Sequence, residues 1–230
     1  MRNNCFIYIV DAPVSENLDE ELKKTFGDER AVHLYRDLVG TSYKLAANFK
    51  DDTVVISYKR APKYPDLTWL DDNDPGFLEP KTQNLGERIY HAFRWGFNDG
   101  AQKALMLFTN VPRIETEWIK RAINYISPGR IVLGPAGEKP YLLGLCLENI
   151  AVLKEINFNA VDLVDNILER ARRNRIEVDL LPESFAVKDE ESLRKWLESK
   201  EDNISLFARE EVKEHKKKGK RQSHREEFHR

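Results

Sequence analysis

The chain has 230 residues, of which 41% are hydrophobic and 10% aromatic, enough for one large domain with a substantial core. Its 37 basic and 39 acidic residues nearly cancel, so a net charge of −2 excludes a bulk attraction of the whole chain for nucleic acid. No apolar run is long enough for a membrane span, and the first run, Phe6–Val10, is too short for a secretory signal, so we expect a cytoplasmic protein.

The first half of the chain alternates strand-like and helical patterns. The expected elements are a strand at 6–10, helices at 19–26 and 28–48, and a strand at 53–58. A long connection, residues 59–82, follows with four prolines and with apolar side chains that include Trp69, Leu70 and Phe77. Because a loop of this length inside a domain is usually functional or disordered, we expect it to pack, with the crevice at the strand ends as one candidate place.

The second half continues the alternation. The expected elements are helices at 85–98, 116–126, 161–174 and 189–200, and strands at 105–108, 131–133, 141–147 and 176–181. The Gly-Pro-Ala-Gly run at 134–137 is predicted to be a loop between two of these strands. It is too short for a parallel crossover, so one of the two strands should be antiparallel. The pattern predicts an α/β sandwich with a mixed, mainly parallel sheet.

The strand at 105–108 ends at two small polar residues, Thr109 and Asn110, and Pro112 prevents its continuation. An unbroken apolar run of this length is typical of a strand buried on both faces of a parallel sheet. Ligands of such sheets bind at the carboxyl ends of the strands. Thr109 and Asn110 are therefore candidate ligand contacts.

Several segments together resemble a bacterial family of nucleotide-diphospho-sugar-transferase-like proteins with the GT-A glycosyltransferase fold, including arsenosugar-biosynthesis-type members. They read Leu-Gly-Glu-Arg at 85–88, Thr-Asn-Val-Pro at 109–112, Leu-Gly-Pro-Ala at 133–136 and Tyr-Leu-Leu-Gly-Leu at 141–145. The resemblance covers roughly residues 5–198. It implies a GT-A-like three-layer sandwich, a nucleotide or sugar-nucleotide ligand, and Mg²⁺ or Mn²⁺ as the cofactor.

The site motifs that the resemblance implies are altered in this chain. Asp11 stands where the resemblance implies a lysine after the first strand, and Glu16 stands where it implies a glycine. The implied Lys-Thr-Arg is replaced by Asp-Glu-Glu at 19–21. The expected Ser-Asp-x-Pro reads Thr-Asn-Val-Pro at 109–112, and the expected Asp-Gly-Gly-Tyr reads Glu-Lys-Pro-Tyr at 138–141. Both leading aspartates of a C-terminal Asp-x-Asp motif are replaced, by Ala186 and Lys188. Carboxylates in place of cations repel a diphosphate, and Asn110 offers a metal only a neutral carbonyl.

The candidate ligand-binding residues are Asp11, Arg88, Thr109, Asn110, Glu138 and Tyr141. Five of them also have a structural interpretation: an Asx turn for Asp11, a structural ion pair for Arg88, a turn for Asn110, a solvated loop for Glu138 and core packing for Tyr141. No catalytic residue is assigned. The five histidines lack metal-ligand spacing, and Cys5 and Cys146 lie in apolar runs, so no metal ligand is assigned either.

Residues 208–230 form a basic tail with nine Lys or Arg against five Glu, predicted to be helical or disordered and separate from a domain at 1–207. The tail could contact RNA, an anionic membrane or an acidic partner, or it could only increase solubility. We do not expect the rest of the chain to bind nucleic acid. Three functions stay open: a transferase-like protein whose metal-dependent chemistry is lost or altered (a pseudoenzyme), an active glycosyltransferase or nucleotidyltransferase with an atypical site, and a non-catalytic binding or scaffold module.

Overall fold

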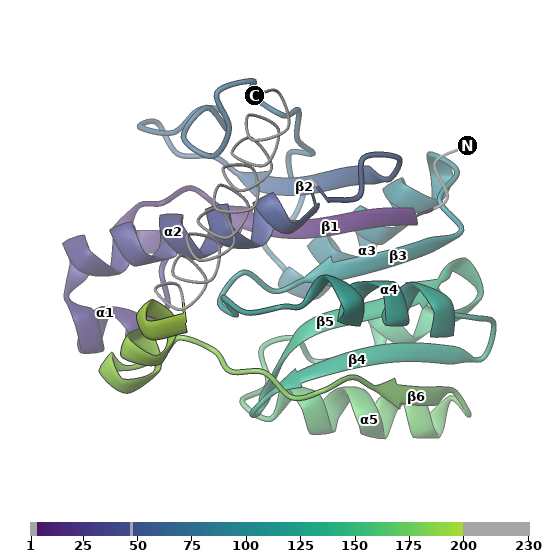
Figure 1. Ribbon diagram of the computed structural model, residues 1–230. Coiled ribbons are helices and arrows are strands. Elements are labelled where there is room, and N and C mark those ends of the chain that lie inside the picture. The colour runs from purple at the N-terminus through teal and green to yellow at the C-terminus, as the bar shows by residue number, and fades with distance from the viewer. Residues whose placement is uncertain (1–3, 47, 200–230) are drawn as a thin grey trace, which may run out of the picture. The chain divides into compact units, whose positions relative to one another are not determined.

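A single mixed sheet forms the centre of the fold (Figure 1). The computed structural model describes residues 4–46 and 48–199. Within them the strands are β1 (Asn4–Asp11), β2 (Thr53–Lys59), β3 (Lys103–Leu107), β4 (Arg130–Ala136), β5 (Lys139–Cys146) and β6 (Glu177–Leu180), in the order β2-β1-β3-β5-β4-β6. β5 runs antiparallel to both of its neighbours, whereas the other pairs are parallel. The predicted mainly parallel sheet with one reversed strand is confirmed.

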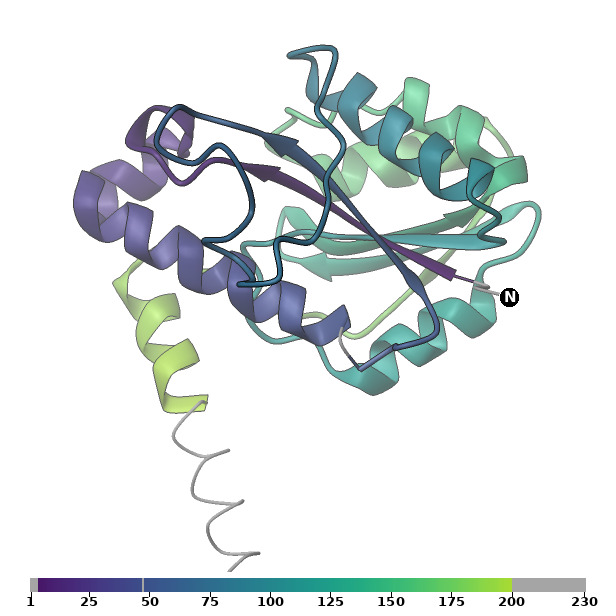
Figure 2. The same cartoon turned by 90° about the horizontal axis from the view of Figure 1, so that it is seen from above.

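Helices cover both faces of this sheet and make three layers (Figure 2). They are η1 (Ser15–Asn17), α1 (Glu20–Phe26), α2 (Asp28–Ala46), α3 (Leu85–Asn98), α4 (Thr116–Tyr125), η2 (Leu147–Lys154) and α5 (Leu163–Arg173). Side chains of β1 alternate between the layers: Phe6 and Tyr8 pack with α2 and α4, while Cys5 and Ile7 pack with α3, η2 and α5. The three-layer α/β sandwich agrees with the GT-A-like fold expected from the resemblance.

The segment 134–137 differs from the predicted loop. β4 continues through Pro135 to Ala136, which pairs with Lys139, so β4 and β5 form a tight hairpin around Gly137 and Glu138. A shift of register between Gly134 and Pro135 accommodates the proline, because an irregular position does not need its missing N–H. Gly137 has a φ of +69°, the left-handed conformation that glycine adopts without strain.

The long connection packs against the outer edge of β2 and the α2 side of the sheet. Leu67 is fully buried there, and Trp69 donates from Nε1 to the Tyr58 hydroxyl at 3.2 Å. Leu78 bridges to β2, since its N–H donates to Ile56 and its carbonyl accepts from Tyr58. The prediction that this loop packs is confirmed: it bonds to the edge strand β2 and also, through Asp71, to the Tyr43 hydroxyl of α2 at 3.2 Å.

The chain separates into two units, Met1–Asp189 and Glu190–Arg230. The second is described only over residues 190–199, which are helical. The predicted boundary at 207/208 and the basic tail lie outside the described residues. Among the residues that are described, no helix is both long and apolar enough to cross a membrane.

Candidate functional site

The topology brings five of the six candidate residues to one edge of the sheet. β1 ends at Asp11, and the parallel strand β3 leads into Thr109 and Asn110. The antiparallel strand β5 starts at this same edge: Phe108 donates its N–H to the carbonyl of Tyr141 at 3.0 Å, and Glu138 lies in the turn just before β5. This is the carboxyl edge at which sheets of this class bind ligands.

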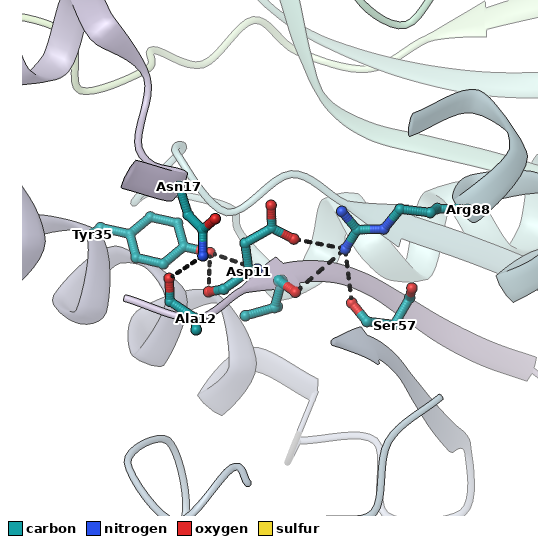
Figure 3. A network of polar contacts seen from close by, with 7 residues as sticks. Asp11, Ala12, Asn17, Tyr35, Ser57 and Arg88 are labelled. Atoms are coloured by element: carbon teal, nitrogen blue, oxygen red, sulfur yellow. Dashed lines mark hydrogen bonds and ion pairs between the residues drawn. The ribbon is translucent and has the colours of Figure 1, made fainter. Parts of the chain in front are cut away.

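Arg88, the sixth candidate, reaches the same edge from α3. The cap of this helix explains its position: the Asn84 side chain accepts from the Glu87 N–H at 3.0 Å, so α3 begins at Leu85 and Arg88 lies in its first turn. The Arg88 side chain is 5% exposed and points to the end of β1 (Figure 3). A cation at a helix N-terminus opposes the helix dipole, so this guanidinium requires a nearby anion or acceptor.

Asp11 supplies that anion. Its Oδ1 lies 2.7 Å from Arg88 Nη2, and its side chain is 29% exposed. The same Nη2 donates longer hydrogen bonds, 3.4 Å each, to the carbonyls of Val10 and Ser57 (Figure 3). Arg88 therefore joins the ends of β1 and β2 to α3. The carboxylate of Asp11 therefore does not form the Asx turn considered for it, because its partner is Arg88, which is distant in the sequence.

Tyr35 of α2 holds the backbone of Asp11 from the other side. Its hydroxyl donates to the Asp11 carbonyl at 3.0 Å and accepts from the Asp11 N–H at 3.1 Å. Burial raises the pKa of Tyr35, so the hydroxyl stays protonated. In the loop that follows, Asn17 donates from its amide to the Ala12 carbonyl at 3.0 Å. The position of Asp11 is thus fixed by two helices and its own loop.

Asn110 and Thr109 are half-buried at the end of β3. The carbonyl of Asn110 accepts from the N–H of Val187 at 3.0 Å. Val187 belongs to a segment that follows β6 and crosses this edge, since Ser184 also donates its N–H to Pro135 at 2.9 Å. The sequence reading missed this crossing segment, because residues 182–187 carry no periodic pattern that distinguishes a strap from a linker.

Glu138 and Tyr141 lie in very different surroundings. Glu138 is exposed in the hairpin turn, and its carbonyl accepts from the N–H of Val164 at 2.9 Å. Tyr141 is fully buried, donates its hydroxyl to the Pro182 carbonyl at 3.0 Å and stacks at 5.7 Å from Trp118. Burial raises the pKa of Tyr141. These contacts agree with the interpretation of Tyr141 as a residue that packs in the core.

The donor set at this edge does not fit a divalent metal. Mg²⁺ and Mn²⁺ need several hard oxygen ligands that converge on one point. In the described part of the chain, no three His, Cys, Asp or Glu side chains are grouped closely enough to hold an ion. The carboxylate of Asp11 is already paired with Arg88, and Asn110 offers a neutral amide.

Two cavities of the described structure lie away from the Asp11–Arg88 pair. One, of about 470 Å³, is lined by Phe26, Gly27, Asp28, Glu29, Arg30 and His33. The other, of about 290 Å³, is lined by Thr41, Ser42, Lys44, Leu45, Asn48, Val111, Pro112 and Ile114. The second touches the loop directly after Asn110 but none of the six candidate residues lines either cavity.

Comparison with protein families gives one match, over residues 45–160, to a family described as uncharacterized proteins conserved in bacteria, DUF2064. The chain belongs to the DUF2064 family. The matched stretch contains Arg88, Asn110, Glu138 and Tyr141 but not Asp11. A comparison with curated proteins finds no match.

Solved structures similar to this DUF2064 chain include proteins named as transferases. A protein of Desulfovibrio desulfuricans, provisionally named a nucleotide-diphospho-sugar transferase, is 25% identical with a TM-score of 0.69, over 82% of this chain and 84% of that one. A nucleotidyl transferase from Methanothermobacter (9% identity, TM-score 0.55, 85% and 98% covered) and the 4-diphosphocytidyl-2C-methyl-D-erythritol synthase of Anaerococcus prevotii (9%, 0.52, 83% and 94%) share the fold alone. Together these neighbours confirm the nucleotide-sugar-transferase-like fold.

Proposed function

We propose that this chain is a nucleotide-diphospho-sugar-transferase-like protein that does not carry out metal-dependent sugar-nucleotide transfer. The observation that carries the proposal is the Asp11–Arg88 ion pair at the end of β1. The family resemblance implies a lysine at position 11, where it would face a diphosphate. Here a carboxylate stands at that position and neutralises the nearest buried cation.

The surrounding charges support the same conclusion. Glu16 and Glu21, both exposed, follow Asp11 in the segment that the resemblance assigns to the phosphates, whereas Glu20 is paired with Lys23 at 2.6 Å. Two like charges about 4 Å apart repel by roughly 4 kcal/mol at an effective dielectric constant of 20. A diphosphate with its two or three negative charges is therefore disfavoured in this segment.

Lys59 is a basic side chain that an anion would still find at the end of β1. It is the register partner of Asp11 on β2 and is half-buried, whereas its neighbour Arg60 pairs with Glu79. One lysine beside a neutralised arginine gives at most weak, metal-independent attraction for a phosphate. The active-enzyme alternative would depend on Lys59, so its removal belongs in the test.

The proposal is tested by calorimetry with UDP-, GDP- and CDP-sugars, each with and without Mn²⁺ or Mg²⁺. We expect no metal-dependent heat from any donor. Weak binding without metal should disappear in Lys59→Gln. Micromolar binding that requires the metal would refute the proposal and establish the alternative, an active transferase with an atypical site.

A further inference from the structure

Asp11 and Arg88 satisfy only part of each other's hydrogen-bonding capacity. The contact between them joins one carboxylate oxygen, Oδ1, to one terminal nitrogen, Nη2. Figure 3 shows the second oxygen of Asp11 and the second terminal nitrogen of Arg88 on the same side of this contact. A carboxylate oxygen only accepts and a guanidinium N–H only donates. The pair therefore presents an acceptor beside a donor, at a position where Asp11 is 29% exposed.

The guanidinium is also incompletely satisfied by the protein. Among the described residues, neither Arg88 Nε nor Asp11 Oδ1 has a hydrogen-bond partner, although both are buried and Oδ1 belongs to the ion pair. The two hydrogen bonds from Nη2 are long at 3.4 Å. Buried donors without an acceptor are uncommon because each costs about 1–3 kcal/mol. Structural arginines normally have their donors filled, so this one retains capacity for another molecule.

Both side chains are held in place before any ligand arrives. The two hydrogen bonds from Tyr35 lock the backbone of Asp11, and burial restricts Arg88. Asn17 is anchored through its amide nitrogen to the carbonyl of Ala12, the residue after Asp11, at 3.0 Å. Groups fixed in this way bind with a smaller entropic loss than mobile ones.

We infer that the Asp11–Arg88 pair is a binding site for a neutral ligand with two adjacent hydroxyl groups, a sugar moiety without phosphate, and that Asp11 determines this specificity. One hydroxyl donates to the free oxygen of Asp11 while its neighbour accepts from Arg88. A phosphate offers only acceptors at neutral pH and would face the carboxylate of Asp11 directly. This inference rests on the proposed function and names the ligand class of the same site.

Adjacent hydroxyls occur both in free sugars and glycosides and in the ribose of a nucleoside. The two sources share their chemistry but differ in the attached group, so the test includes both. The probes are methyl α-pyranosides of glucose, mannose and galactose, uridine, and UDP, each measured by saturation-transfer NMR on the full chain in the presence of EDTA.

We expect millimolar binding of at least one methyl pyranoside or of uridine, without metal, and at least tenfold weaker binding of UDP than of uridine. Deoxy analogues of the bound ligand each lack one hydroxyl. Removing either hydroxyl of one adjacent pair should weaken binding at least tenfold, and removing any other hydroxyl should not. This arm needs no change in the protein, so it decides the question even where a variant folds poorly.

Two variants complete the test. Asp11→Asn removes the charge and turns one oxygen into a donor, and it should lose sugar binding at least tenfold. Glu79→Gln makes the same change in the exposed pair with Arg60 and should bind like the parent. The inference is overturned if no diol binds the parent at tens of millimolar, if all deoxy analogues bind equally, or if Asp11→Asn binds unchanged. The proposed function fails separately, through metal-dependent binding of a sugar nucleotide.

Discussion

Replacing Asp11 by asparagine should destabilise the fold far more than an equivalent change at the surface. The substitution keeps the size of the side chain but leaves the guanidinium of Arg88, 5% exposed, without its counter-ion. Breaking one side of a buried ion pair costs about 3–5 kcal/mol. Because the Asp11 side chain is 29% exposed and water can reach it, we expect a cost below this scale, about 2–3 kcal/mol.

The matched control is Glu79→Gln. Its carboxylate pairs with Arg60 at 2.9 Å, but the two side chains are 58% and 48% exposed. Exposed ion pairs contribute about 0–1 kcal/mol, so this variant should unfold close to the parent. Both changes remove one negative charge, which cancels any general effect of net charge on stability.

The free energy of unfolding of both variants can be measured from urea transitions followed by tryptophan fluorescence. A loss of 2–3 kcal/mol corresponds to a fall in melting temperature of roughly 5–10 °C for a chain of this size. The double variant Asp11→Asn/Arg88→Met should regain part of that loss, because it no longer buries an unpaired charge. The reasoning is refuted if Asp11→Asn and Glu79→Gln differ by less than about 0.5 kcal/mol.

Other predictions concern the packing and the thiols. Gly134→Ala should destabilise by about 1–3 kcal/mol, because its Cβ would lie 2.4 Å from the ring of Tyr141. Gly40→Ala, in mid-helix with nothing within 4 Å of the new Cβ, should instead stabilise by about 0.5–1 kcal/mol; equal thermal shifts for the two would contradict this account. Burial raises the pKa of Cys5 to about 12, so it should resist alkylation at pH 8 until the chain unfolds. The folded chain disfavours the Cys5 thiolate, so the contribution of the neutral thiol to the free energy of unfolding should be complete below pH 9 and should decline between pH 9 and pH 12. Cys5→Ala should lack this decline.

Much of the fold was predictable because local signals and tertiary packing agree. α3 has the predicted bounds, Leu85–Asn98, since an asparagine cap precedes it and Gly100, with a φ of +103°, follows it. The antiparallel pairing of β4 and β5 was predicted, but the extent of β4 was mispredicted for the opposite reason. Glycine and proline at 134–137 are typical of a loop, but pairing with β5 extends the strand through them. The residues at 134–137 alone cannot show that β5 pairs with them across the register shift at Gly134 and Pro135.

The positions of the candidate residues were predictable, but their contacts were not. Strand ends follow from hydrophobic runs, so Asp11 and Asn110 were located correctly at the carboxyl edge. The contact of Asp11 with Arg88 depends on how α3 docks on the sheet, which no pattern within either segment encodes. The link from Asn110 to Val187 depends likewise on a strap whose residues have no periodicity.

The ion pair also explains how the fold tolerates a reversed charge at β1. Arg88 lies in the first turn of α3 and is nearly buried, so some anion must stand opposite it whatever the ligand. In relatives with a lysine at the position of Asp11, as the resemblance implies, two cations would meet there, and a bound diphosphate is the natural anion for them. Here the chain supplies the anion itself. Under the proposed function, the carboxylate that disfavours a diphosphate is also the anion that Arg88 requires, so the stability of this region would not depend on nucleotide binding.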